Sequence, residues 1–183
     1  MSKKLAYVIG APASGKSTAV ANALRGVQPL EEERQPFPYT VYKGGIQLGA
    51  NREGHSGTDA MGYTVLPKVL SFLKTTEYDN VIGEGDRLTN KPFFNSVIEQ
   101  GWDLEIIYFS IPDYIAQRRR YLRGTKQNEI WANGRATKVK NIVKQFSKFI
   151  HEIDATDSKE SVGRQLRERS AFRGIFIRET VNV

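Results

Sequence analysis

The residues best suited to chemistry stand near the start of the chain, in the run Gly10-Ala11-Pro12-Ala13-Ser14-Gly15-Lys16-Ser17. This run meets the pattern G-x-x-x-x-G-K-S, whose glycines let backbone N–H groups surround a phosphate without Cβ clashes. In such a loop the lysine bridges the β- and γ-phosphates of a nucleotide, and the serine hydroxyl binds Mg²⁺. The pattern therefore predicts a site for ATP with Mg²⁺ over residues 10–18, ending at Thr18. Lys16 is predicted to be catalytic and Ser17 to be a metal ligand.

The two elements that must position this loop are both indicated by the sequence. The apolar run Lys4–Ile9 predicts a buried strand before the loop, and Ser17–Leu24 has apolar residues at helical spacing after it. The N-terminal dipole of that helix would add to the attraction for phosphate. A glycine- and serine-rich turn with an incidental lysine is the alternative, and it requires neither element.

Transfer of a phosphoryl group to a hydroxyl also needs a carboxylate that orients the hydroxyl and takes its proton. Asp59 is the first candidate, because it opens a helix-like segment directly after a polar run. We predict that Asp59 is this base and that Arg52, His55, Ser56 and Thr58 contact the substrate. The alternatives are a helix N-cap for Asp59, since aspartate is favoured there, and a solvated loop position for His55.

A second acidic group follows the predicted strand Asp79–Gly83. Ligands of α/β sheets bind at the carboxyl ends of strands. We therefore predict that Glu84 serves the metal and that Asp86 and Arg87 serve the acceptor. The alternative is a charged surface turn.

Positive charge is concentrated in one region of the chain. The net charge is +7, yet residues 115–148 alone carry ten Lys or Arg against one acid. Arg119 and Arg123 are one helical turn apart and share a face. We predict that they belong to an arginine-rich lid at about 118–136 and stabilise transition-state charge. A solvated helix end is the alternative.

The basic region extends beyond what one triphosphate needs, because Arg135 and four lysines at 138, 140, 144 and 148 continue it. Trp131 lies among them, and an aromatic ring between cations can stack on a base or wedge beside a flipped one. Trp131 and Arg135 are therefore predicted to bind substrate. The alternatives are core packing for Trp131 and the polar face of an amphipathic helix for the lysines.

The pattern of strands alternating with helices predicts an α/β fold with a mostly parallel five-stranded sheet flanked by helices, in a single domain over residues 1–183. Further strands are expected at Tyr39–Lys43, Ile46–Leu48, Leu104–Ile111 and Glu152–Thr156, and further helices at Asp59–Leu73, Pro92–Glu99, Asp113–Leu122, Ala136–Ile150 and Ser158–Arg169. The Gly44-Gly45 pair predicts a hairpin. Residues 29–38, 51–58 and 124–134 are expected to be irregular, and the tail 174–183 has strand-like alternation.

Composition narrows the class of protein. The chain has no cysteine, which excludes disulfides and Cys-based metal sites. No apolar run approaches the roughly 20 residues of a membrane span, and the N-terminus does not read as a cleavable signal. A cytoplasmic protein without a membrane partner is expected.

Several of these segments together resemble the small P-loop kinases, namely Gly10–Ser17, Val81–Arg87, the arginine-rich segment and Glu152–Gly163. The resemblance implies a P-loop NTPase/kinase fold and places Ala155 and Thr156 beside the adenine. Within that group, the run from Leu48 to Gly62 resembles the bacteriophage 5-hydroxymethyluracil DNA kinases, which phosphorylate the hydroxymethyl group of the modified base. This narrower resemblance implies DNA carrying 5-hydroxymethyluracil as partner and Asp59 as the acceptor-side base. It also implies the host cytoplasm as the location, if the chain is phage-encoded.

Three functions follow from these observations. The first is a kinase acting on 5-hydroxymethyluracil in DNA. The second keeps the chemistry but changes the acceptor to a nucleoside, a nucleotide or a small metabolite. The third is a nucleotide-dependent DNA-binding module that transfers nothing and needs no acceptor-side base.

Overall fold

A seven-stranded sheet forms the centre of the molecule in the computed structural model, which describes residues 2–52, 55–124 and 128–177. Its strands lie in the spatial order β2 (Glu31–Glu33), β3 (Tyr39–Tyr42), β4 (Gly45–Leu48), β7 (Asn80–Glu84), β1 (Lys4–Gly10), β8 (Asp103–Ser110) and β9 (Ile150–Asp154). The five strands from β4 to β9 are mutually parallel. The predicted α/β fold is thus confirmed, as is the predicted hairpin of β3 and β4. The structure adds β2, which pairs with β3 to complete an antiparallel edge.

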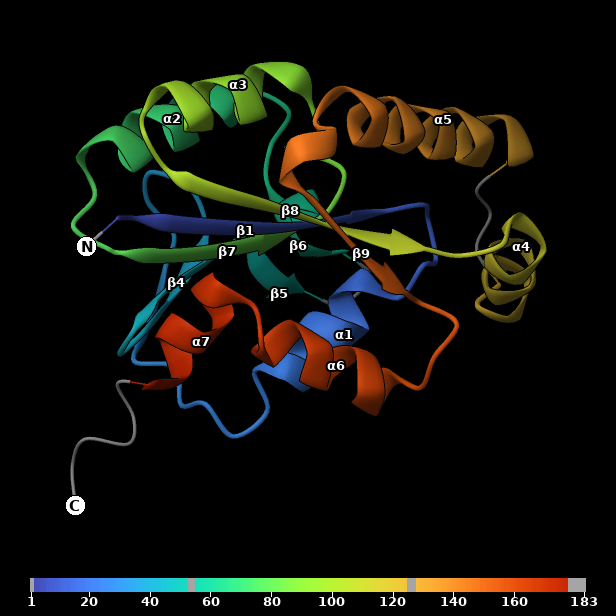
Figure 1. Ribbon diagram of the computed structural model, residues 1–183, viewed down its shortest axis with the longest axis horizontal. Coiled ribbons are helices and arrows are strands. Elements are labelled where there is room, and N and C mark those ends of the chain that lie inside the picture. Colours follow the sequence, from blue (N-terminus) through green and yellow to red (C-terminus); the bar gives the residue numbers. More distant parts are fainter. Residues whose placement is uncertain (1, 53–54, 125–127, 178–183) are drawn as a thin grey trace.

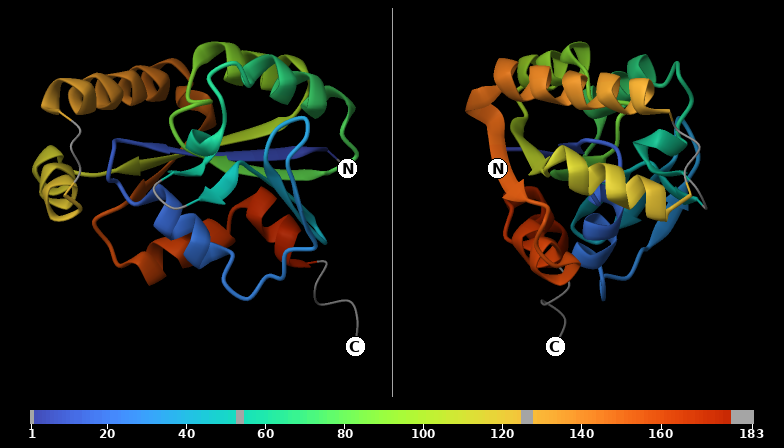
Figure 2. Two further views of the ribbon diagram at one scale, coloured as in Figure 1. Left: turned by 180° about the vertical axis from the view of Figure 1, so that it is seen from behind. Right: turned by 90° about the vertical axis from the view of Figure 1, so that its right-hand side faces the viewer.

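Helices cover both faces of this sheet (Figures 1 and 2). One layer contains α2 (Leu66–Thr75), α3 (Lys91–Glu99) and α5 (Glu129–Gln145), and the other contains α1 (Lys16–Ala23), α6 (Lys159–Arg167) and α7 (Ser170–Ile177). The helix α4 (Asp113–Leu122) stands apart, beyond the carboxyl end of β8. Strand β1 is buried on both faces, because Leu5, Tyr7 and Ile9 pack toward the first layer and Ala6 and Val8 toward the second.

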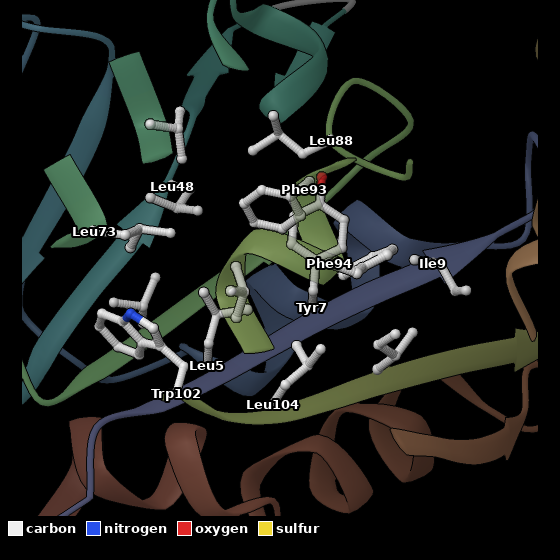
Figure 3. Packing of buried hydrophobic residues seen from close by; sticks show 14 of the residues in the cluster. Leu5, Tyr7, Ile9, Leu48, Leu73, Leu88, Phe93, Phe94, Trp102 and Leu104 are labelled. Atoms are coloured by element: carbon white, nitrogen blue, oxygen red, sulfur yellow. The ribbon is translucent and has the colours of Figure 1, made fainter. Parts of the chain in front are cut away.

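A cluster of aromatic side chains under the first helix layer lies next to the carboxyl end of β7. Tyr7 is fully buried between Phe93 and Phe94, with ring centroids 5.4 and 5.7 Å away in edge-to-face geometry (Figure 3). Such pairs contribute about 0.5–1.5 kcal/mol beyond their burial. The packing fixes the direction of the Tyr7 hydroxyl, which reaches Thr58 beyond the end of β7.

Several predicted element boundaries were wrong. Residues 59–73 do not form one helix, because the chain makes a short 3-10 helix, η1 (Thr58–Ala60), and α2 begins only at Leu66. Gly62 and Pro67 explain the break, since proline fits only the first turn of a helix. The polar segment after β4 forms a two-stranded hairpin of β5 (Ala50–Arg52) and β6 (His55–Gly57) rather than an irregular loop.

Three further corrections concern α5, the C-terminal tail and the connection at residues 29–38. Helix α5 begins at Glu129, inside the region expected to be irregular, and ends at Gln145, so that a second 3-10 helix, η2 (Ser147–Phe149), precedes β9. The predicted strand-like tail is helical through Ile177, and its remainder lies outside the described residues. Strand β2 occupies part of the connection 29–38.

Candidate active site

The phosphate-binding loop lies between the end of β1 and the start of α1, as its sequence predicts. Positive backbone φ angles at Ala13 (66°) and Gly15 (94°) turn the chain into the helix. The ammonium of Lys16 donates hydrogen bonds to the carbonyls of Gly10 (2.9 Å) and Ala11 (3.2 Å) in its own loop. Enclosure in the loop lowers the pKa of Lys16, and the nearby carboxylate of Glu84 opposes that change. The loop therefore concentrates a cation where phosphates would bind.

Two oxygen donors lie beside the phosphate loop, the hydroxyl of Ser17 in the first turn of α1 and the carboxylate of Glu84 at the end of β7. Glu84 ends β7, next to β1, and its Oε1 accepts a hydrogen bond of 2.8 Å from the Ser17 hydroxyl. The carboxylate is buried, and burial raises its pKa to about 7, although Lys16 and the Ser17 bond act in the opposite direction. A hydroxyl and one carboxylate fit Mg²⁺, which takes few protein ligands and completes its shell with phosphate oxygens and water. Ser17 and Glu84 are thus the residues that could hold it.

Asp59 lies against the loop that follows β7. Its Oδ1 accepts backbone N–H bonds from Asp86 (2.9 Å) and Arg87 (3.0 Å). Beside it, Thr58 donates to the Glu84 carbonyl (2.9 Å) and lies 2.7 Å from the Tyr7 hydroxyl. The 3-10 helix that carries Asp59 is therefore fastened to the end of β7 at Glu84 and to the loop that follows it at Asp86 and Arg87.

Two glycines permit this close approach. Gly57 has φ 62°, and a Cβ there would collide with the Glu84 carboxylate. Gly85 has φ 120°, and its Cβ would meet the side chains of Thr58 and Asp59. Because other residues avoid these φ values, glycine is needed at both positions to bring the two carboxylates into one site.

Arg119 and Arg123, the two arginines predicted to act in a lid, line a cavity of about 280 Å³. Arg119 donates to the carbonyls of Ser14 (3.3 Å) and Ala155 (3.0 Å), so it joins the phosphate loop to the segment after β9. The cavity is lined by Ser14, Gly15, Thr18, Ala19, Phe109, Arg119, Arg123, Ala155, Asp157, Lys159 and Val162. Its position beside the phosphate loop suits the base and sugar of a nucleotide.

The opposite rim of the site is basic and aromatic. The Asp86 carboxylate pairs with Arg135 (2.5 Å) and Lys138 (3.1 Å) of α5. The Arg135 guanidinium also lies 5.4 Å from the centre of the Trp131 ring. Trp131 is 38% exposed, which argues against the core-packing alternative. This rim therefore combines cations with an accessible aromatic ring.

Comparison with known proteins identifies the family. The family model described as P-loop Nucleotide Kinase3 matches residues 1–175. The chain belongs to this family of P-loop kinases. Membership supports a phosphotransferase that uses a nucleotide.

Two solved structures are similar to this chain at low sequence identity. Deoxyadenosine kinase from M. mycoides with bound dATP has a TM-score of 0.50 and 16% identity, over 88% of this chain and 96% of that one. Shikimate kinase from Aquifex aeolicus vf5 has a TM-score of 0.41 and 17% identity, over 94% and 98% of the two chains. A comparison with curated proteins gave no significant match. Among the described residues, no helix is long and apolar enough to cross a membrane.

The structure brings most of the predicted site residues together. The bonds described above gather five of them at the carboxyl ends of the central strands, namely Lys16, Ser17, Glu84, Asp59 and Arg119. Arg123 and Ala155 line the nucleotide-sized cavity, and Asp86, Arg87 and Arg135 form the opposite rim.

Other predicted residues are placed differently. Thr58 is fully buried, so it positions Asp59 rather than contacting a substrate. Thr156 donates its N–H and hydroxyl to Asp154 beside the cavity. Arg52 and His55 are paired across the β5–β6 hairpin, and Ser56 pairs with Asn51, but the side chains of Arg52 and His55 lie outside the described part of the structure.

Sequence reasoning missed some residues of the site. Phe109, Lys159 and Val162 line the cavity, and Tyr63 contacts Arg87 on the opposite rim. Phe109 could have been found, because it stands at the carboxyl end of a strand that neighbours β1. Nothing in the local sequence indicates that Tyr63 meets Arg87.

Proposed function

We propose that this kinase transfers the γ-phosphoryl group of ATP to the hydroxymethyl group of 5-hydroxymethyluracil in DNA. The observation that carries the proposal is the short loop after β7. It begins at Glu84, which is bonded to the phosphate loop, and its next residues hold Asp59 through their backbone. A donor site and an acceptor-side carboxylate therefore share one loop, as phosphoryl transfer to a hydroxyl requires.

On the donor side, each residue has a defined task in the proposal. Lys16 leaves the carbonyls of its own loop and bonds to the β- and γ-phosphates, and Ser17 and Glu84 are the residues that would hold Mg²⁺. When bound, the metal neutralises charge on the phosphate oxygens. Arg119 and Arg123, beside the cavity that would take the adenine, stabilise the charge that develops on the transferred group.

On the acceptor side, Asp59 removes the proton of the hydroxymethyl group through Oδ2, since Oδ1 is engaged by the backbone. The hydroxyl oxygen forms a bond to the γ-phosphorus. The bond between that phosphorus and the β–γ bridging oxygen breaks, and ADP leaves with its electron pair. The products are ADP, the phosphorylated base and a proton on Asp59.

A basic and aromatic surface supports DNA as the form of the acceptor. The outward face of α4 carries Tyr114 and Tyr121, which are 70% and 84% exposed, with exposed Arg118 between them at helical spacing. Ile130 and Trp131 are two further exposed apolar side chains, at the start of α5. Exposed rings interleaved with arginine suit stacked bases and a phosphate backbone. The resemblance of residues 48–62 to the 5-hydroxymethyluracil DNA kinases points to the same acceptor.

The second candidate is a kinase of a free nucleoside or nucleotide. The description of the matching family favours it, because it names a nucleotide kinase. In that case the exposed surface of α4 has no part in catalysis.

The experiment offers radiolabelled ATP and Mg²⁺ with three acceptors. These are duplex DNA containing 5-hydroxymethyluracil, the same duplex with thymine in its place, and free 5-hydroxymethyl-2′-deoxyuridine. We expect label only in the modified duplex and, more weakly, in the free nucleoside. Lys16→Ala should remove transfer to both.

Salt separates the two candidates further. Transfer to DNA should fall steeply as salt is raised, because counterions compete for the phosphate backbone, while transfer to a free nucleoside should change little. Label in the nucleoside without label in the modified duplex would favour the second candidate and refute the first.

A further inference from the structure

Tyr63 is an exposed aromatic residue of this chain that no predicted role explains. It lies in the segment between η1 and α2, and it is 87% exposed. The guanidinium carbon of Arg87 lies 3.8 Å from the centre of its ring. This distance is typical of a stacked pair, so the arginine supports one face of a ring that otherwise meets solvent.

Stability does not account for this arrangement. A ring that remains so exposed gains little from burial, and exposed cation–π pairs are weak. In addition, Nε of Arg87 is enclosed and has no hydrogen-bond partner among the described residues, which is unfavourable for a charged donor. The fold thus holds the guanidinium against the ring at some cost, as expected when the pair serves a ligand.

The pair lies beside the acceptor-side carboxylate. The backbone N–H of Arg87 donates to Asp59 Oδ1 at 3.0 Å, and Tyr63 follows Asp59 by four residues. Asp86, the neighbour of Arg87, binds the basic residues of α5. Tyr63 therefore stands at the entrance to the group that would receive the acceptor hydroxyl.

We propose that Tyr63, backed by Arg87, is the stacking platform for the planar base of the acceptor. The base lies on the ring, and its substituent hydroxyl points toward Asp59. The inference rests on the proposed function, because it names the residue that holds the acceptor base. Stacking accepts any planar base, so the platform aligns the base while the placement of Asp59 selects the base that carries a hydroxyl.

The test is a kinetic comparison of Tyr63→Leu and Tyr63→Trp with the wild type, on modified DNA and on the free nucleoside. Loss of a base–aromatic stack should raise the acceptor KM about tenfold in Tyr63→Leu, within the range that such stacks contribute. Tyr63→Trp should restore the KM. The KM for ATP should stay within about twofold, and the melting temperature should not change, because the ring is exposed.

Phe176→Leu is the matched control, because Phe176 also stacks with an arginine, Arg167, at 5.2 Å, but in the other helix layer. It should leave the acceptor KM unchanged. An acceptor KM in Tyr63→Leu within twofold of wild type, with transfer to DNA intact, overturns the platform and leaves the proposed function standing.

The same assays also distinguish failure of the proposed DNA substrate from failure of the Tyr63 platform. Transfer to the nucleoside alone, with a raised KM in Tyr63→Leu, overturns the DNA substrate and keeps the platform. Transfer only to non-planar alcohols, or to no acceptor, overturns both.

Discussion

Asp59 has two roles in this structure, one structural and one proposed, and two substitutions separate them. Its Oδ1 accepts the N–H groups of Asp86 and Arg87 at 2.9 and 3.0 Å. Asp59→Asn keeps an oxygen at Oδ1 and removes the charge. Asp59→Ala removes both bonds and leaves two N–H groups without their acceptor.

The expected stability changes follow from these bonds. A hydrogen bond to a charged group contributes roughly 1.5–3 kcal/mol, and neighbouring bonds are not additive, so Asp59→Ala should lose about 3 kcal/mol. For a chain of this size that lowers the melting temperature by about 10 °C. Asp59→Asn exchanges charge-assisted bonds for neutral ones and should lose only about 1 kcal/mol.

Asp59→Asn, which should cost little stability, should nevertheless cause a large loss of rate. If Asp59 takes the acceptor proton, Asp59→Asn should lower kcat by roughly 10²–10⁴-fold, the usual range for a general base. The assay is transfer of labelled phosphate from ATP to the modified duplex, with the KM for ATP and the melting temperature measured on the same preparations. The KM for ATP should be unchanged, because Asp59 lies on the acceptor side. A kcat within threefold of wild type would falsify the catalytic role and leave Asp59 as an anchor of the loop after β7.

Three further predictions concern the donor side and the backbone. Burial raises the pKa of Glu84 to about 7, so without nucleotide and metal the folded state keeps a proton that the unfolded state has lost. The free energy of unfolding should therefore fall as the pH rises from 4.5 to 7, by up to about 3 kcal/mol from this group. Urea unfolding of Glu84→Gln should lack that decrease. Arg119→Ala should raise the KM for ATP about tenfold, and Arg119→Lys should not restore it, because an ammonium lacks the fork that spans two carbonyls; an unchanged KM in steady-state assays would contradict this role. Gly57→Ala should destabilise the protein by about 3 kcal/mol, because φ is positive there and the new Cβ would clash with the Glu84 carboxylate. Gly26→Ala is the control, since φ is 89° but no atom lies near the new Cβ, and it should cost only about 1 kcal/mol. Equal losses in chemical unfolding would argue against the clash.

Helix boundaries in the second half of the chain illustrate what local patterns could not predict. Residues 124–134 were expected to be irregular, yet Asn128 caps α5 by accepting the N–H of Trp131 at 2.7 Å, and buried Ala132 packs the first turn. The tail was expected to alternate as a strand. It is helical because Ala171, Phe172 and Ile175 share one buried face, which is visible only when the pattern is read from residue 170.

The substrate-side residues were predicted from composition and order, but their partners were not. The pairing of Asp86 with Arg135 joins residues 49 positions apart. The stack of Tyr63 on Arg87 likewise depends on how η1 is fastened to β7, and that fastening requires the glycines at 57 and 85. No sequence window contains both members of these pairs, so their meeting could not be read from spacing.

The sequence by itself determined the donor chemistry of this protein, because a phosphate loop is a contiguous device. One strand, eight loop residues and the helix that follows suffice to place the glycines, Lys16 and Ser17, whatever the rest of the chain does. The parallel sheet was likewise determined by short apolar runs that alternate with helices. Only the tertiary structure decided which carboxylates and cations face that loop, because Glu84, Asp59 and Arg119 come from separate elements whose approach depends on packing around Tyr7 and on close backbone contact.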